Sequence, residues 1–90
     1  MKYKLTSNQV ASKVAGETVI LNHKKGAYYG LDEVGGLVWD LLEKGPQTLE
    51  TLCDEVMKQY DVDQATAQAD LDGLLQSLIT ENLVETAEDK

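Results

Sequence analysis

The sequence lacks several features that would point to chemistry or to a membrane. Its only cysteine is Cys53 and its only histidine is His23, so no intrachain disulfide can form, and the reducing cytoplasm is the simplest compartment. No run of about 18 apolar residues occurs, so no membrane span is predicted. Sixteen acidic residues against eight basic ones give a formal charge of -8, which disfavours nucleic acid and anionic lipid as partners.

The composition is that of a folded chain of modest size. Ninety residues that are 42% hydrophobic predict a single domain over residues 1–90, with its core at about residues 10–85. The N-terminus is expected to be flexible, and the polar tail from residue 86 to 90 is expected to fray. A domain of this size has no room for a deep chamber, so any site should be a surface groove.

Alternating apolar residues between two turn signals predict β structure from residue 10 to 31. Three strands are expected, at about residues 10–15, 17–22 and 27–31. In the second strand Val19 and Leu21 face one way and Thr18 and Ile20 the other. Neither face is purely polar, so both faces should be partly covered.

The period then becomes helical, and three helices are predicted. Asp32, Thr48 and Asp63 are the expected N-caps, and Gly45-Pro46, Tyr60 and Asn82 mark the expected ends. The first helix is expected to turn a stripe of aliphatic residues inward: Val34, Leu37, Val38, Leu41 and Leu42.

Three strands followed by three helices predict an α+β fold of winged helix-turn-helix type, with a three-stranded antiparallel sheet. Gly35-Gly36 interrupts the first helix, which predicts that another element packs very close to that turn. Trp39 falls on the Gly35 flank, outside the aliphatic stripe, and a buried position there is favoured over ligand contact.

No residue pattern predicts catalysis, a metal or a cofactor. Cys53 lies on the apolar face of the second helix, where a thiol behaves as a small hydrophobe. Asp61-Val62-Asp63 lacks the glycine and distal glutamate of a calcium loop, so helix capping is its favoured role. A cysteine hydrolase would need an exposed Cys53 with a base nearby.

The stretch from Gly26 to Asp32 is the most informative part of the chain. It is a short aromatic strand that passes directly into the first helix. A strand in this position offers unpaired backbone groups beside an apolar crevice, which suits capture of an extended peptide. Tyr28 and Tyr29 point to opposite faces, so at most one shares a face with the helices.

An ordered series of short motifs resembles the PqqD-like proteins over about residues 10–85. The tyrosine-glycine-leucine run is most similar to that of stand-alone members from lasso-peptide clusters. The stretches that carry the resemblance are residues 16–21 (GETVIL), 26–35 (GAYYGLDEVG), 39–42 (WDLL), 48–52 (TLETL), 60–62 (YDV), 69–71 (ADL) and 82–85 (NLVE).

The resemblance implies a RiPP recognition element, a non-catalytic domain that binds the leader of a ribosomally synthesised precursor peptide and delivers it to modifying enzymes. In that family the leader adds an antiparallel strand to the third strand, in a cleft closed by the third helix. Carried onto this chain, the implied peptide-binding residues are Ala27, Tyr28, Tyr29, Gly30, Leu31, Ala67, Asp70, Leu71 and Leu74. Leu71 and Leu74 could instead be core residues.

Several interpretations stay open at this point. The implied partners are the leader and a leader-cleaving protease or, in another RiPP pathway, a radical enzyme. The free strand edge could also support a homodimer. A winged-helix DNA-binding regulator is the alternative from another class, but residues 64–81 contain no lysine or arginine and include Asp70 and Asp72.

Overall fold

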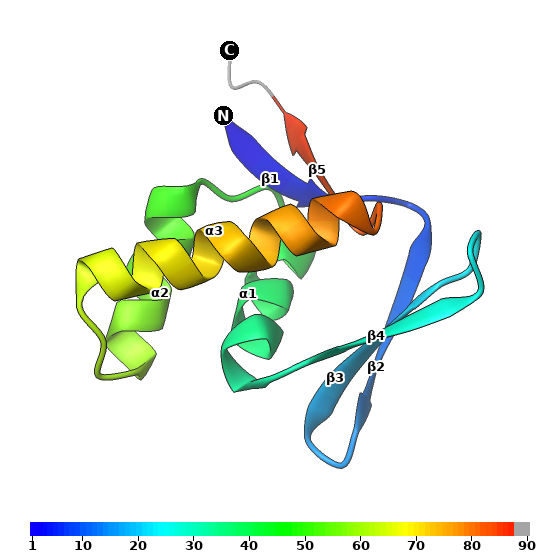
Figure 1. Ribbon diagram of the computed structural model, residues 1–90, viewed down its shortest axis with the longest axis horizontal. Coiled ribbons are helices and arrows are strands. Elements are labelled where there is room, and N and C mark those ends of the chain that lie inside the picture. Colours follow the sequence, from blue (N-terminus) through cyan, green and yellow to red (C-terminus); the bar gives the residue numbers. More distant parts are fainter. Residues whose placement is uncertain (88–90) are drawn as a thin grey trace.

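A three-stranded antiparallel sheet lies beside three helices in the computed structural model, which describes residues 1–87 (Figure 1). A second, two-stranded sheet brings the two ends of the chain together at the top of the view. In chain order the elements are β1 (Lys2–Leu5), β2 (Gln9–Val14), β3 (Glu17–Asn22), β4 (Ala27–Leu31), α1 (Glu33–Glu43), α2 (Leu49–Gln59), α3 (Gln64–Thr80) and β5 (Val84–Ala87).

The three predicted strands and their antiparallel arrangement are confirmed as β2, β3 and β4, with β3 in the centre. The turn between β2 and β3 consists of Ala15 and Gly16, both at positive φ (53° and 84°). Two-residue hairpins favour this pair of conformations because their twist matches that of the strands. The resulting register places Val10 opposite Leu21, and Leu21 opposite Tyr28.

The sheet buries one face. Thr18, Ile20 and Asn22 of β3 are buried against the helices, whereas Val19 and Leu21 on the other face are half-buried. The predicted alternation in β3 is therefore confirmed, and the partner of its inner face is the helical part of the chain.

The predicted helix boundaries are confirmed at all three N-termini. Asp32, Thr48 and Asp63 each accept a hydrogen bond from the backbone N–H three residues later, at 2.8, 3.1 and 2.8 Å. At the end of α3, Asn82 adopts a left-handed conformation (φ 60°), and the Leu83 N–H donates to the Leu78 carbonyl at 2.9 Å. These features form a Schellman cap, which ends the helix where the sequence predicts.

The inward face of α1 differs from the expected aliphatic stripe. Val38 and Leu42 are buried as predicted, but Val34, Leu37 and Leu41 are only half-buried. The helix is rotated toward the sheet, so its buried side instead includes three residues outside that stripe: Gly35, Gly36 and Trp39. The two glycines permit this rotation because they carry no side chain between the helix and the strands.

The close approach predicted from Gly35-Gly36 is found. A Cβ on Gly36 would lie 3.1 Å from the Thr18 hydroxyl, and a Cβ on Gly35 would lie 3.1 Å from the Leu31 Cβ. Trp39 is 1% exposed and lines a hollow between α1 and the sheet together with Ala11. Its favoured assignment to the interior is confirmed.

The strand count was wrong at both ends of the chain. The N-terminal segment forms β1, in which Tyr3 is 6% exposed and exchanges two backbone hydrogen bonds with Gln47. The short extended segment after α3 is β5, which pairs with β1 and includes Thr86. Each strand is too short to show its period alone, and the pairing joins segments about eighty residues apart. Residues 88–90 of the expected tail lie outside the described part of the chain.

Candidate functional site

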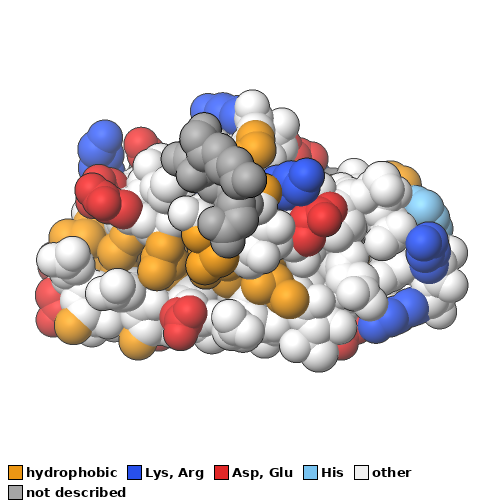
Figure 2. Space-filling model, turned by 90° about the horizontal axis from the view of Figure 1, so that it is seen from above, with side chains coloured by type: hydrophobic (Ala, Val, Ile, Leu, Met, Phe, Trp, Pro, Cys, Tyr) orange, Lys and Arg blue, Asp and Glu red, His pale blue; other side chains and the backbone are white. Residues whose placement is uncertain are grey.

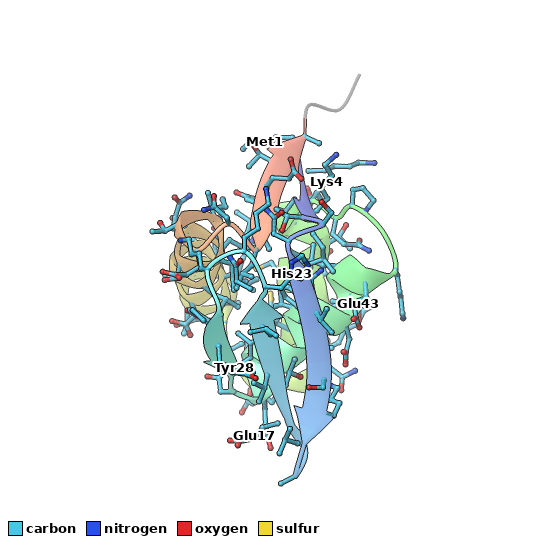
Figure 3. All side chains as sticks on the ribbon, turned by 90° about the vertical axis from the view of Figure 1, so that its right-hand side faces the viewer. Met1, Lys4, Glu17, His23, Tyr28 and Glu43 are labelled. Atoms are coloured by element: carbon cyan, nitrogen blue, oxygen red, sulfur yellow. The ribbon has the colours of Figure 1, made fainter. Side chains whose placement is uncertain are left out.

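The edge of the sheet formed by β4 is free of any strand partner among residues 1–87. In the register with β3, Tyr29 lies opposite Ile20 and Leu31 lies opposite Thr18, so both face the helices. Tyr28 is on the outer face of the sheet and 73% exposed, and Figure 3 shows it there on β4. Of the two tyrosines, Tyr29 is therefore the one that shares the helical side.

Helix α3 faces this edge across two hollows of about 310 and 370 Å³. The first lies between Tyr29 and the C-terminal part of α3, and the second between Asp32 and the middle of α3. We call the two together the β4–α3 groove, and its lining consists of Tyr29, Asp32, Val34, Gly35, Asp70, Leu74, Gln76, Ser77, Thr80 and Glu81.

Asn22 holds one end of the groove. Its buried side chain donates from Nδ2 to the Glu81 carbonyl at 2.8 Å, and its Oδ1 accepts from the backbone N–H groups of Lys24 and Lys25, each at 3.1 Å. The Lys25 ammonium also lies 4.0 Å from Glu81 Oε1. These contacts tie the turn before β4 to the end of α3, so the spacing between strand and helix is set by a satisfied polar network.

The other end of the groove is set by the junction of β4 with α1. Asp32 caps α1, and Gly35 packs against Leu31 at the end of β4. Because the junction contains no linker, the strand and the helix cannot separate without breaking the cap. The Asn22 network therefore ties the sheet to α3 at one end of the groove, and the Asp32 cap fixes β4 to α1 at the other.

The structure brings some of the predicted site residues into the groove and places others beneath it. Asp70 and Leu74 line it from α3, and Tyr29 lines it from β4. Ala67 and Leu71 are buried in the core, so they support the groove from below. Ala27 and Gly30, like Tyr28, are exposed along the strand, and Leu31 is buried at its end.

Sequence reasoning missed the C-terminal half of the α3 wall. Asp70, Leu74, Ser77 and Glu81 follow one another at intervals of four, three and four residues, which is one stripe of a helix. Extending the predicted wall along this stripe would have found Ser77 and Glu81. Val34 was also missed, because the expected rotation of α1 turned it inward.

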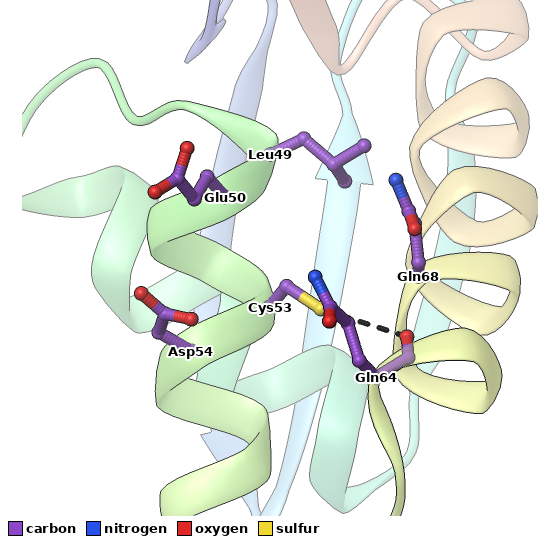
Figure 4. A pocket seen from close by; sticks show the side chains of 6 residues that line it. All are labelled: Leu49, Glu50, Cys53, Asp54, Gln64 and Gln68. Atoms are coloured by element: carbon purple, nitrogen blue, oxygen red, sulfur yellow. Dashed lines mark hydrogen bonds between the residues drawn. The ribbon is translucent and has the colours of Figure 1, made fainter.

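The hollow beside Cys53 does not have the chemistry of a nucleophilic site (Figure 4). Burial, with a smaller contribution from the Asp54 carboxylate, raises the pKa of the thiol, so the reactive thiolate is disfavoured. The Cys53 Sγ lies 4.0 Å from the Gln64 carbonyl. His23 is exposed at the turn between β3 and β4, at the far end of the sheet from the Glu17 hairpin turn (Figure 3).

Charge is distributed unevenly over the molecule. From residue 9 to 31 the basic residues Lys13, Lys24 and Lys25 face a single acidic one, Glu17. Figure 2 shows lysine side chains and the histidine at the end of the molecule where the sheet lies. The excess of carboxylates therefore belongs to the helical part, including the groove.

Residues 1–87 contain no group of three or more histidine, cysteine, aspartate or glutamate side chains placed to hold a metal ion. No helix in this part of the chain has both the length and the apolar character needed to cross a membrane.

The sequence profile described as "Coenzyme PQQ synthesis protein D (PqqD)" matches residues 17–84. The chain belongs to the PqqD family. The matched residues run from the start of β3 to the start of β5, so they include both walls of the β4–α3 groove. The resemblance found in the sequence motifs is thereby confirmed. Among curated proteins, none matches this PqqD-family chain.

Two solved structures are similar over nearly their whole length. One, described as "TbiB1 in Complex with the TbiA(beta) Leader Peptide", is 35% identical with a TM-score of 0.86, and the match covers 96% of this chain and 99% of that chain. The other, "Lasso peptide synthetase B1 complexed with the leader peptide", is 19% identical with a TM-score of 0.84, covering 96% and 100%. The predicted fold class is confirmed by this similarity.

Proposed function

We propose that this chain binds the leader of a ribosomally synthesised precursor peptide and delivers it to modifying enzymes of lasso-peptide biosynthesis. The observation that carries the proposal is the free edge of β4, which faces α3 across a groove in a member of the PqqD family. The 35% identical structure of TbiB1 contains a leader peptide, which supports a leader as the ligand here.

The leader binds as an added strand antiparallel to β4. Main-chain hydrogen bonds to the strand edge supply affinity that tolerates many sequences, and side chains entering the groove supply selectivity. Tyr29 and Leu74 contribute the apolar contact area from the two walls, while alternate residues of β4 contribute the backbone groups that point away from β3. Ala67 and Leu71 keep α3 at the correct distance.

The chain itself performs no chemistry in this proposal. The raised pKa of Cys53 and the exposed position of His23, far from it along the fold, both argue against a nucleophilic pair. Catalysis belongs to a partner such as a leader-cleaving protease or another maturation enzyme, and the complex forms in the cytoplasm. A radical enzyme as partner, as in other RiPP pathways, would use the same groove.

Titration calorimetry with the leader of the precursor encoded beside this chain tests the proposal. We expect one leader per chain, and Leu74→Ala should weaken binding roughly tenfold because the variant removes apolar surface that the leader covers. Val14→Ala is the control, since Val14 is exposed on β2, away from the groove. No heat of binding, or equal losses in the two variants, would contradict leader capture in the groove.

Sedimentation of the free protein tests whether its unpaired edge also supports a homodimer. Two β4 edges that pair with one another would block the groove, so leader should convert dimer to monomer. A dimer that persists with bound leader would show that self-association, where it occurs, uses another surface.

A further inference from the structure

One hollow of the groove combines apolar walls with carboxylates. Val34 and Leu74 provide the walls, Gly35 adds no side chain, and Asp32 and Asp70 provide the carboxylates. None of the described residues that line this hollow is basic. At the other end of the groove, the Glu81 carboxylate is already paired with Lys25. The carboxylate at the Glu81 end of the groove therefore has a cationic partner, whereas no basic residue lines the hollow that holds Asp32 and Asp70.

The shape of this hollow suits a long side chain with an aliphatic stem and a cationic tip. Lysine and arginine lay their methylene groups along apolar surface while the charged end seeks carboxylates or water. Asp32 Oδ1 accepts the N-cap hydrogen bond from Gly35, but a carboxylate has two oxygens, so Asp32 can accept a second donor without losing the cap.

The two hollows also fix which end of a bound strand meets the carboxylates. Tyr29 shares its hollow with residues 76–81, whereas Asp32 shares its hollow with Asp70 and Leu74. Strand β4 therefore runs antiparallel to α3. A peptide antiparallel to β4 enters with its N-terminal end beside Asp70 and leaves with its C-terminal end beside Glu81.

From these observations we propose that the hollow at Asp32 and Asp70 selects a lysine or arginine at the N-terminal end of the bound leader segment. The inference rests on the proposed function, because it assumes a strand in the β4–α3 groove. The acidic groove attracts a basic leader segment, and the Asp70 carboxylate accepts a charge-assisted hydrogen bond from the lysine or arginine at one position of that segment. A strand lying over the hollow would partly exclude water and strengthen that contact.

Selection from a random twelve-residue peptide library displayed on phage tests the inference whatever the sequence of the natural leader. Selected peptides are first checked by amide chemical shifts, and those that perturb β4 and α3 are kept. Among these we expect lysine or arginine at one fixed position near the N-terminal end. Asp70→Asn should weaken them roughly threefold to tenfold, and this loss should shrink as salt increases.

Asp72→Asn is the matched control, because Asp72 is an exposed carboxylate on the same helix that lines a different hollow, beside Leu49 of α2. It should leave the affinity of the selected peptides nearly unchanged. Groove-binding peptides without basic enrichment, with tyrosine enriched instead, or with equal losses in the two variants, would overturn the inference and leave leader capture standing. A library that yields no groove-binding peptide would overturn both.

Discussion

The two adjacent tyrosines of β4 are a natural matched pair. Tyr29 lines the groove, whereas Tyr28 lies on the outer face of the sheet. Tyr29→Ala should weaken leader binding roughly tenfold because it removes aromatic contact area, and Tyr28→Ala should change it by less than about twofold because Tyr28 offers the leader mainly its backbone. Fluorescence anisotropy with a labelled leader measures both. A larger loss from Tyr28→Ala would place the ligand on the outer face.

The cap of α3 makes one contribution to stability depend on pH. The Thr66 N–H donates to the Asp63 carboxylate, and this hydrogen bond lowers the pKa of Asp63 below its usual 3.8. A lowered pKa means that the carboxylate stabilises the fold above the unfolded pKa, and that this contribution is lost as pH falls through the folded value.

We therefore expect Asp63→Ala to lower the midpoint of thermal unfolding clearly at pH 7 and much less at pH 2.5. Thr48→Ala, which removes the uncharged cap of α2, should lose about 1 kcal/mol at both pH values. Calorimetric scans of the two variants and the parent provide the comparison. A pH-independent loss in Asp63→Ala would mean that the charge of the cap contributes nothing.

At the scale of elements, two helical glycines should respond in opposite ways to alanine. Gly73 lies in α3 with no atom within 4 Å of the position of an added Cβ. Gly73→Ala should therefore raise the free energy of unfolding by about 0.5–1 kcal/mol, the usual difference in helix propensity. Gly36→Ala should give no such gain, because its Cβ would meet the hydroxyl of buried Thr18 at 3.1 Å.

Urea unfolding measures the two glycine variants with the same probe. A gain from Gly36→Ala equal to that from Gly73→Ala would show that β3 moves aside easily to make room for an added methyl group on α1. A loss confined to Gly36→Ala would instead show that the close packing of α1 on β3 tolerates no added methyl group.

The elements show why much of the fold could be predicted from sequence. Capping residues and breakers act locally, so Asp32, Thr48 and Asp63 marked three helix starts and Asn82 marked an end. The rotation of α1 could not be predicted from its aliphatic stripe alone, since the rotation depends on the close contact of Gly36 with the sheet. For the same reason the predicted site left out Val34, which lines the groove.

At the scale of the whole molecule, the ends of the chain contribute to the fold. Pairing of β1 with β5 depends on two segments that are distant in sequence, which is the kind of contact that local patterns do not reveal. The pairing places Tyr3 beside the α1–α2 connection, where the backbone N–H and carbonyl of Tyr3 form hydrogen bonds with the backbone of Gln47. Residues 2–5, which belong to the N-terminal part expected to be flexible, form strand β1 in the structure.

Tyr3→Ala tests the role of that second sheet. A buried aromatic side chain replaced by alanine should lower the free energy of unfolding by about 3 kcal/mol. Tyr28→Ala, which removes an exposed tyrosine, should change it by less than about 0.5 kcal/mol. Equal stability of the two variants in urea would show that β1 is dispensable for the fold.

Leader capture by strand addition requires the β4 edge to become an interior strand when leader binds. Hydrogen exchange of the free and leader-bound protein, read residue by residue by NMR, measures this most directly. We expect alternate amides of Ala27–Leu31 to gain strong protection, since every second N–H of an edge strand points away from its neighbour. If the amides of β2 or of α3 gain protection while those of β4 do not, strand addition is contradicted.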